Sequence, residues 1–538
     1  MSRFVFVAIV LAPFCLAEDA ALIDILKSEL DRNFSVLKQK ADPAPYYLSY
    51  SVIEQQAEVL SGTLGALQGR NRNASRLLDV SIRVGSPKLD NYHSTRGERP
   101  RFTSASLLPI DNTADAIRRR LWLDTDRSFR LATQRLINLK TSTQVSVAAE
   151  DDSDDFSSEE SSQLIAEPRK FAIKSEEWAS RIRKWSGEFN KYPRVLNSGV
   201  TVRLSNETKY FVSTEGTRLQ HGRGFARITI AAEAKALDGM DLVTTESFEA
   251  EDPGGLPTEA VITKAINKVG DDLTKLLDAP VVDPFVGPAI LSGEAAGVFF
   301  HEIFGHRIEG HRQKDETDGQ TFTKMVNSKI LPEFLTVVFD PTRREAAGVD
   351  LNGTYAYDDE GVKARPVTVV EKGTLKTFLM SRSPIKGFSQ SNGHGRKQAG
   401  LEVVSRQSNL IVESAKQVSD AELRNMLIEE IKRQGKSYGF YFQQVTGGYT
   451  TTGRSGFQSY KVLPLIVYRV YPDGRPDELV RGVDIVGTPL ASFARILATS
   501  NRPEVFNGYC GAESGSVPVS AVSPAMLISE IEIQKKEK

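Results

Sequence analysis

The pattern of apolar and polar residues divides the chain into helical and strand-like segments. Residues 19–40 carry apolar side chains at intervals of three and four positions, the spacing that places them on one face of an amphipathic helix. Similar spacing predicts long helices over residues 111–139 and 258–277. Strand-like patterns occur in five segments of the same half: residues 46–60, 77–84, 200–204, 210–213 and 226–234. The first half of the chain therefore mixes helices and strands.

Strand patterns dominate after residue 280. The alternating segments there are residues 334–339, 366–371, 375–380, 462–471 and 527–534. One helix is predicted after Ser419, because Ser419 and Glu422 form a capping box and Gly435 follows the apolar run. The expected fold class is α+β, with an N-terminal mixed α/β part followed by a C-terminal domain dominated by antiparallel β-sheet.

Two features suggest how the chain is divided. The turn Asp278-Ala279-Pro280 ends a predicted helix, so we place the main boundary there, between residues 18–280 and 281–538. Residues 150–162 form a dense acidic and serine-rich run inside the first part, which predicts a solvated linker or loop.

The N-terminus has the pattern of a cleavable secretion signal over residues 1–17. Arg3 precedes an apolar run over residues 4–16, and small Ala17 comes directly before polar Glu18. The run is shorter than the roughly 20 apolar residues that a spanning helix needs, and no later segment is apolar enough to be one. We therefore expect an exported protein, periplasmic or extracellular and most consistent with a bacterial source.

Charge and cysteine usage narrow the function classes. Lys plus Arg (68) nearly balances Asp plus Glu (69), so the overall charge predicts neither nucleic-acid nor anionic-membrane binding. Of the two cysteines, Cys15 would leave with the signal, and Cys510 would then have no intrachain partner. Cys510 is therefore an inert buried residue, a link to another molecule, or a residue that does chemistry.

A cluster of histidines and glutamates provides candidate metal chemistry. Three of the six histidines lie within eleven residues, together with two glutamates: His301, Glu302, His306, Glu309 and His311. Imidazole nitrogens bind zinc, and a carboxylate beside them can take a proton from a metal-bound water. The cluster predicts a metal site more strongly than any one histidine does, since a lone histidine on an apolar face is usually a core residue.

The spacing of the cluster is unusual. His301 and His306 are five residues apart, so on a regular helix they would diverge by roughly 140°. An HExxxH helix therefore needs a π-bulge, or an end near Gly305, to bring both side chains to one point. Glu309 could orient a histidine or act as a ligand, and His311, beyond Gly310, could be a surface residue.

A third ligand is needed, because a catalytic zinc takes three protein ligands and leaves one position for water. Cys510 is the candidate, since Gly508 and Gly511 beside it would let the backbone approach a site closely. The alternative is that Cys510 is a small buried hydrophobe.

Several motifs in order resemble the TldD/PmbA family of metallopeptidases, most clearly over residues 284–533. The matching segments are His301–His306 with Glu309-Gly310, residues 357–361 (YDDEG), 369–376, 392–396 (NGHGR), Gly447-Gly448, Cys510-Gly511, 516–519 and Pro524. The resemblance implies one zinc per chain, held by His301, His306 and Cys510, with Glu302 as general base. It also implies short or unfolded peptides as substrates, and a homodimer or a heterodimer with a related chain.

Further roles and rival functions stay open at this point. His394 or Arg396 could donate to the oxyanion of the reaction, or their segment could simply be a loop. Cys510 could be the nucleophile of a cysteine hydrolase, or the chain could be a non-catalytic binding subunit that retains metal for structure. Glu302 argues against the last alternative, because a structural metal site needs no base.

Overall fold

The computed structural model describes residues 21–95, 100–103, 105–143, 151–167, 170–456, 459–488 and 492–536. The predicted secretion signal, residues 1–17, lies outside them. The described chain contains helices and two large, mainly antiparallel sheets, which confirms a mixed fold with substantial antiparallel sheet. None of the helices in these ranges combines the length and the apolarity that a membrane crossing requires.

The first sheet has eight strands in the order β3-β2-β1-β6-β7-β5, with β4 on β2 and β8 on β7. Its strands are β1 (Pro45–Thr63), β2 (Ala66–Ser86), β3 (Leu89–Asp90), β4 (Ser106–Leu107), β5 (Gln163–Ile165), β6 (Asn197–Ser213), β7 (Arg218–Lys235) and β8 (Asp241–Ala250). Only β5 runs parallel to its neighbour. Four long strands thus form one continuous surface.

Some strands are longer than the apolar pattern predicts. Residues 200–204 and 210–213 belong to a single strand, β6, because the polar residues between them are buried and bonded; Asn206, for example, donates to the Phe171 carbonyl at 2.9 Å. Likewise β1 and β2 continue to a tight turn at Leu64-Gly65, and the polar residues of that hairpin are paired across the strands.

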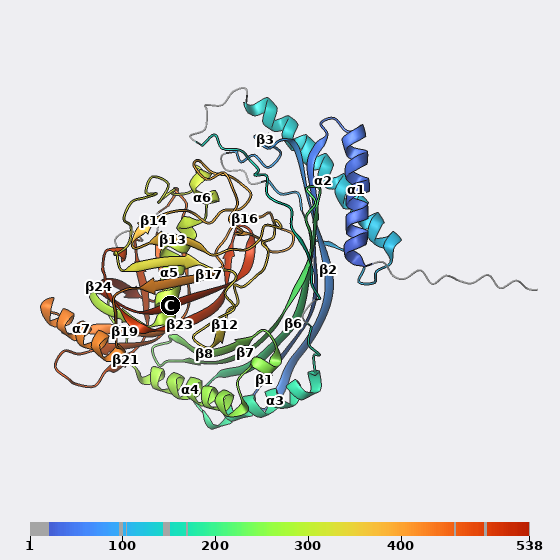
Figure 1. Ribbon diagram of the computed structural model, residues 1–538. Coiled ribbons are helices and arrows are strands. Elements are labelled where there is room, and N and C mark those ends of the chain that lie inside the picture. The colour runs from blue at the N-terminus through green and yellow to red at the C-terminus, as the bar shows by residue number, and fades with distance from the viewer. Residues whose placement is uncertain are drawn as a thin grey trace, which may run out of the picture.

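Helices cover the outer face of this sheet. The helices are α1 (Leu22–Lys40), α2 (Ala114–Thr143), α3 (Ser175–Gly187) and α4 (Glu259–Asp278), with the 3-10 turns η1 (Glu188–Lys191) and η2 (Pro253–Gly255). Apolar residues of α1 and α2 pack with β1 and β2, and those of α3 and α4 pack with β6 and β7. Figure 1 shows the sheet curving around the C-terminal half, with α1 and α2 on the far side. The predicted helices 19–40, 111–139 and 258–277 are therefore confirmed.

The second sheet has twelve strands, and β24 pairs with both β9 and β22, which closes the ring β24-β9-β19-β20-β22. Its strands are β9 (Phe285–Leu291), β10 (Leu335–Phe339), β13 (Val367–Glu371), β14 (Thr374–Leu375), β17 (Asn409–Ser414), β18 (Gln417–Val418), β19 (Gly439–Thr450), β20 (Tyr460–Val470), β21 (Glu478–Val480), β22 (Val483–Gly487), β23 (Ile496–Ala512) and β24 (Gly515–Lys535). Two small pairs accompany it, β11 (Glu345–Ala346) with β12 (Val349–Asp350) and β15 (Gly395–Arg396) with β16 (Val404–Ser405).

The predicted strand 375–380 is wrong beyond Leu375. Leu379 instead exchanges backbone hydrogen bonds with the segment between His306 and His311, donating to Ile308 at 2.9 Å and accepting from Gly310 at 2.8 Å. The Asn392 side chain accepts a hydrogen bond from the Met380 amide at 2.8 Å. These residues therefore brace the loop that follows His306.

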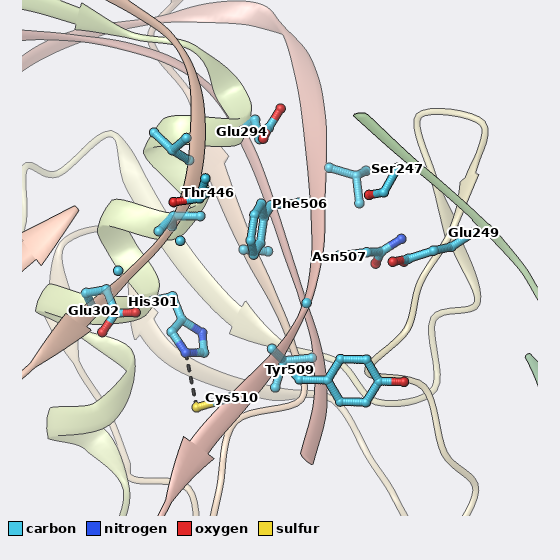
Figure 2. Close-up of a pocket in the computed structure, with 18 of the residues that line it drawn as sticks. Ser247, Glu249, Glu294, His301, Glu302, Thr446, Phe506, Asn507, Tyr509 and Cys510 are labelled. Carbon is cyan, nitrogen blue, oxygen red and sulfur yellow. Dashed lines mark hydrogen bonds between the residues drawn. The ribbon is translucent and has the colours of Figure 1, made fainter. Parts of the chain in front are cut away.

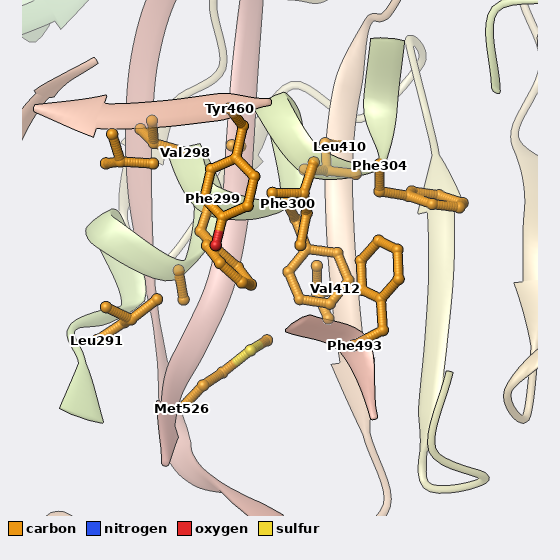
Figure 3. Packing of buried hydrophobic residues seen from close by; sticks show 14 of the residues in the cluster. Leu291, Val298, Phe299, Phe300, Phe304, Leu410, Val412, Tyr460, Phe493 and Met526 are labelled. Carbon is orange, nitrogen blue, oxygen red and sulfur yellow. The ribbon is translucent and has the colours of Figure 1, made fainter. Parts of the chain in front are cut away.

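The helix α5 (Gly293–Ile303), in which every residue except Glu294 is buried, runs through the C-terminal half. Ser292 caps it, accepting from the Ala295 amide at 3.1 Å. Phe299 and Phe300 pack among Tyr460 and Phe493, as Figure 3 shows. The surface helix α7 (Asp420–Arg433) begins as predicted, with Ser419 accepting from the Glu422 amide at 3.2 Å.

The acidic run is not solvated throughout. Asp155, Phe156 and Ser157 are buried, and Ser157 donates its amide to the Arg382 carbonyl at 2.8 Å. The Arg382 guanidinium lies 3.9 Å from the centre of the Phe156 ring and donates back to Ser157. The expectation of a solvated linker is wrong for these residues, because Arg382 supplies a partner for both the ring and the backbone.

Candidate metal site

The histidine cluster lies where α5 ends. His301 and Glu302 are in the last turn of α5, which stops at Ile303, and His306 lies in the 3-10 turn η3 (Gly305–Ile308). The change of helix type, rather than a π-bulge, therefore turns His306 toward His301. At Gly305 an added Cβ would meet the end of the Gln407 side chain, which would have to shift.

Three side chains converge on one point. Sγ of Cys510, on β23, lies 3.2 Å from Nε2 of His301 and 3.3 Å from Nε2 of His306. The three donor atoms lie within 4.8 Å of one another and all three residues are buried. A nitrogen and a sulfur bound to one tetrahedral zinc are about 3.6 Å apart. The donor set and its spacing therefore fit a zinc ion, and Figure 2 shows His301 and Cys510 at the cavity wall.

Cys510 and His306 shift each other's pKa in the site. Burial opposes ionisation of the thiol, yet His306 and His301 together bring the pKa of Cys510 well below its usual value. Burial likewise opposes a charge on His306, but Cys510 and Glu309 raise its pKa well above normal. The two histidines thus favour the thiolate of Cys510, the form that binds metals.

Glu309 orients His306 and is not placed as a ligand. Burial raises its pKa, but His306 and Arg312 outweigh burial and bring that pKa to about 2. An ionised carboxylate can only accept, so Nδ1 of His306 must donate to Glu309, across 3.2 Å. Nε2 then faces Cys510, and it is the nitrogen that would bind a metal once its proton is lost. Arg312 holds the carboxylate from the other side at 2.8 Å.

Glu302 opens onto the cavity beside the three donor atoms. Burial raises the pKa of its carboxyl group, and the neighbouring histidines only partly offset this. The strand β19 passes directly over it at Gly448, where a Cβ would lie 2.7 Å from Cγ of Glu302. Glycine at this position therefore leaves the carboxylate room beside the donor atoms.

The site lies in a cavity of about 1240 Å³ between the two halves of the chain. From the C-terminal half, α5, β19 and β23 line it, and β7 and β8 of the first sheet form the opposite wall. Figure 2 shows Ser247 and Glu249 on that wall, across from His301. The N-terminal half therefore takes part in enclosing whatever binds there.

The other predicted residues lie apart from this cavity or act indirectly. His394 is fully buried, contacts Ser408 Oγ at 3.1 Å, and burial lowers its pKa to about 3. Arg396 donates to the Gln407 carbonyl at 2.6 Å. Neither lines the cavity of the three donor atoms, so neither is placed to donate to an oxyanion there. His311 is half-buried and contacts the Glu513 carboxylate rather than the donor atoms.

Two supporting residues could not be found from the sequence. Nε2 of Gln407 lies 3.4 Å from Nε2 of His301, and Arg406 donates to the Cys510 carbonyl at 2.6 Å. Both belong to a polar run over residues 405–409, which is fully buried. Polar runs usually indicate surface loops, so the residue types alone carried no signal of this role.

This chain is similar to known proteins in both sequence and fold. Residues 286–535 match the PmbA/TldA metallopeptidase C-terminal domain. A metalloprotease of Archaeoglobus fulgidus is 29% identical over 276 residues, covering 51% of this chain and 59% of that protein. A zinc metalloprotease TldD homolog of Saccharolobus solfataricus is 28% identical over 248 residues, covering 46% of this chain and 51% of that protein. The matched segments thus span little more than half the length of these relatives.

The solved structure of TldE from Thermococcus kodakarensis has the same fold, with a TM-score of 0.61 at 12% identity, over 93% of this chain and 100% of that one. The fold is therefore shared well beyond the matched domain. With the family model matching and its relatives named metalloproteases, the C-terminal half of this chain, residues 286–535, is a metallopeptidase domain of the PmbA/TldD family.

Proposed function

We propose that this protein is a zinc-dependent peptidase that hydrolyses short or unfolded peptides. The observation that carries the proposal is the convergence of His301, His306 and Cys510 within 4.8 Å, in the wall of a large cavity. Three such ligands leave one coordination position for water or substrate. One zinc ion per chain follows from the single cluster of this kind among the described residues.

Glu302 is the proposed general base. Its carboxylate lies beside the donor atoms, and burial raises its pKa toward the range in which a group can both accept and return a proton. Zinc, when bound, supplies a Lewis acid that polarises a carbonyl and lowers the pKa of water to about 7. Glu302 would take the proton of the attacking water and pass it to the leaving amine nitrogen.

Metal content and activity of two variants test the proposal. Purified wild-type protein should contain about one zinc per chain, and Cys510→Ala should lose most of it. Glu302→Gln should keep its zinc, because Glu302 is not a ligand, and lose about 10²- to 10⁴-fold in peptide hydrolysis. Wild-type protein that holds no zinc and takes none up would contradict the proposal. So would Glu302→Gln with undiminished activity.

The short contacts of Cys510 also favour a second candidate, a cysteine hydrolase. A thiolate 3.2 Å from an imidazole is the arrangement that a cysteine nucleophile and its base adopt. Removing metal with a chelator distinguishes a zinc peptidase from a cysteine hydrolase. The cysteine hydrolase stays active without metal and is inactivated by alkylation of its thiol. A metal-retaining binding subunit, in contrast, would hydrolyse nothing in either state.

The dimer implied by the family resemblance remains a prediction. The mass in solution, measured by light scattering for this chain alone, distinguishes a homodimer from a monomer that awaits a related chain.

A further inference from the structure

A second cavity, of about 1030 Å³, adjoins the cavity of the metal ligands. Glu249, Asp350 and Tyr509 line both cavities, so the two cavities lie side by side. Tyr509 and Cys510 are neighbours on β23, and successive side chains of a strand point to opposite faces. Figure 2 shows the Tyr509 ring directed away from Cys510. The second cavity is therefore reached from the metal ligands across a single strand.

The second cavity contains a buried arginine that has no acidic partner. Arg396 is 5% exposed, and its guanidinium lies 4.7 Å from the centre of the Tyr355 ring. Nη1 donates to the Gln407 carbonyl at 2.6 Å. In the described parts of the chain, Nε and Nη2 meet no acceptor, and no carboxylate lies within ion-pair distance. Since a buried charge without a counter-ion is costly, the guanidinium is poised for an anion from the cavity.

Asp359, whose carboxylate acts on Arg396 electrostatically, does not fill this role. Asp359 lies in the same cavity, but its carboxylate is already bonded to Lys209 at 2.7 Å and to the Lys397 amide at 2.8 Å. Arg223 also faces the cavity, half-buried, and donates to the Asn352 carbonyl at 3.0 Å. Arg396 therefore shares the cavity with other cationic side chains, and the carboxylates of Asp359 and Glu207, which also line it, already have cationic partners.

We propose that the second cavity binds a carboxylate of the peptide substrate, and that Arg396 receives it. A guanidinium matches a carboxylate with two parallel hydrogen bonds, and Arg396 has the free donors that such a pair needs. The choice of a peptide carboxylate rests on the proposed peptidase function, because the cavity opens beside the metal ligands. The C-terminal carboxylate and an acidic side chain offer the same group.

Equilibrium binding tests the proposal without depending on catalysis. The protein is the full-length Glu302→Gln variant, and the probes are tri-alanine with a free C-terminus, tri-alanine amide, Ala-Ala-Asp amide and inorganic phosphate. Because hydrogen bonds to charged groups contribute more than neutral ones, tri-alanine should bind at least about 10-fold more tightly than its amide. Tight binding of Ala-Ala-Asp amide would show that a side-chain carboxylate is also accepted.

Variants assign the preference to Arg396. Arg396→Gln keeps a donor for the Gln407 carbonyl and should weaken tri-alanine to the level of its amide, whose own affinity stays unchanged. Arg396→Lys keeps the positive charge but not the paired N–H donors of the guanidinium, so its loss of affinity for tri-alanine should be intermediate. Arg223→Gln, at a less buried position, should cause a smaller loss of affinity for tri-alanine. It tests the same site if Arg396→Gln does not fold. Arg72→Gln, an exposed strand arginine, is the matched control and should change nothing.

The outcomes separate this proposal from the peptidase function. Equal binding of tri-alanine and its amide, no measurable binding of either, or an equal loss of both in Arg396→Gln would overturn the carboxylate site. Phosphate competing as well as tri-alanine would overturn its assignment to a peptide. A wild-type enzyme that cleaves peptides but shows no carboxylate preference would leave the peptidase function standing alone. A protein that prefers a free carboxylate but cleaves no peptide would keep the carboxylate site and contradict the peptidase function.

Discussion

Nδ1 of His306 lies 3.2 Å from the Glu309 carboxylate, which leaves Nε2 of the same ring to face Cys510. A carboxylate behind a metal-binding histidine fixes the tautomer and the orientation of the ring. Glu309→Gln removes the charge but keeps the size of the side chain. We therefore expect zinc affinity to fall about 10- to 100-fold, measured by competition with a chelator of known affinity.

The control for this change is Glu371→Gln. Glu371 is exposed at the end of β13 and makes only a long ion pair, 3.5 Å, with Lys376. Its replacement should leave zinc affinity unchanged. Equal affinities in wild type and Glu309→Gln would show that Glu309 does not position His306 for the metal.

The contact between β19 and Glu302 gives a second prediction. A Cβ at residue 448 would lie 2.7 Å from Cγ of Glu302 and 2.7 Å from the Lys461 carbonyl oxygen. Gly448→Ala should therefore push the Glu302 carboxylate aside while leaving the three donor atoms in place. We expect peptide hydrolysis to fall by about 10-fold or more, with zinc content unchanged.

Gly453→Ala is the matched control, because the nearest atom to its added Cβ is 3.8 Å away. It should keep both zinc and activity. If Gly448→Ala loses its zinc as well, the substitution has disturbed the ligands and the specific role of this contact is refuted.

Part of the site could be predicted because its chemistry is carried by rare residue types. Histidines close together and a cysteine stand out in a chain with six histidines and two cysteines, so His301, His306 and Cys510 could be named as candidates. The structure brings them together although Cys510 lies 209 positions after His301. The opposite cavity wall, on β7 and β8, could not be predicted. It is made of ordinary strand residues whose role comes only from the way the two halves pack.

The same contrast holds for the fold. Helices α1, α2 and α4 have long apolar stripes, and periodicity locates them to within a few residues. Residues 205–209 interrupt the apolar alternation of β6, yet the strand continues through them. It can do so because polar groups there find partners distant in sequence, as Asn206 does in the Phe171 carbonyl. Arg382 similarly provides burial for Phe156, which no local pattern could indicate. In β6 and at Phe156, contacts with residues distant in sequence determine the local structure.

A buried ion pair between the two halves makes stability depend on pH. Asp79, on β2, lies 2.8 Å from Lys397 and accepts from the Gly400 amide at 2.9 Å. Burial raises the pKa of Asp79, but Lys397 and the hydrogen bonds outweigh it, so the net pKa is below normal. A carboxyl whose pKa is lower in the folded state stabilises the fold above its unfolded pKa of about 3.9. That contribution is lost as the pH falls through the folded value.

We therefore expect Asp79→Asn to lower the free energy of unfolding by about 3–5 kcal/mol at pH 7, as for other broken buried pairs. The difference from wild type should shrink as the pH falls below about 4, because Asp79 takes up a proton in the unfolded chain before it does so in the folded one. Urea unfolding at several pH values measures both effects. Asp115→Asn, 87% exposed, is the control and should change stability by less than about 0.5 kcal/mol. A difference that does not vary with pH would refute the role assigned to ionised Asp79.

The packing of α5 gives a last prediction, because Phe300 directly precedes His301. Its side chain is fully buried, with ring centres 6.2 Å from both Phe299 and Phe493. Phe300→Ala should lower the free energy of unfolding by about 3–5 kcal/mol, from lost burial and the cavity left behind. Leu123→Ala on α2, where the side chain is 52% exposed, should cost less than about 0.5 kcal/mol. Urea unfolding of metal-free protein measures both.

Since the same helix turn carries His301, zinc affinity should fall in Phe300→Ala and stay constant in Leu123→Ala. A stable Phe300→Ala protein with normal zinc affinity would mean that the ring does not hold this turn in place.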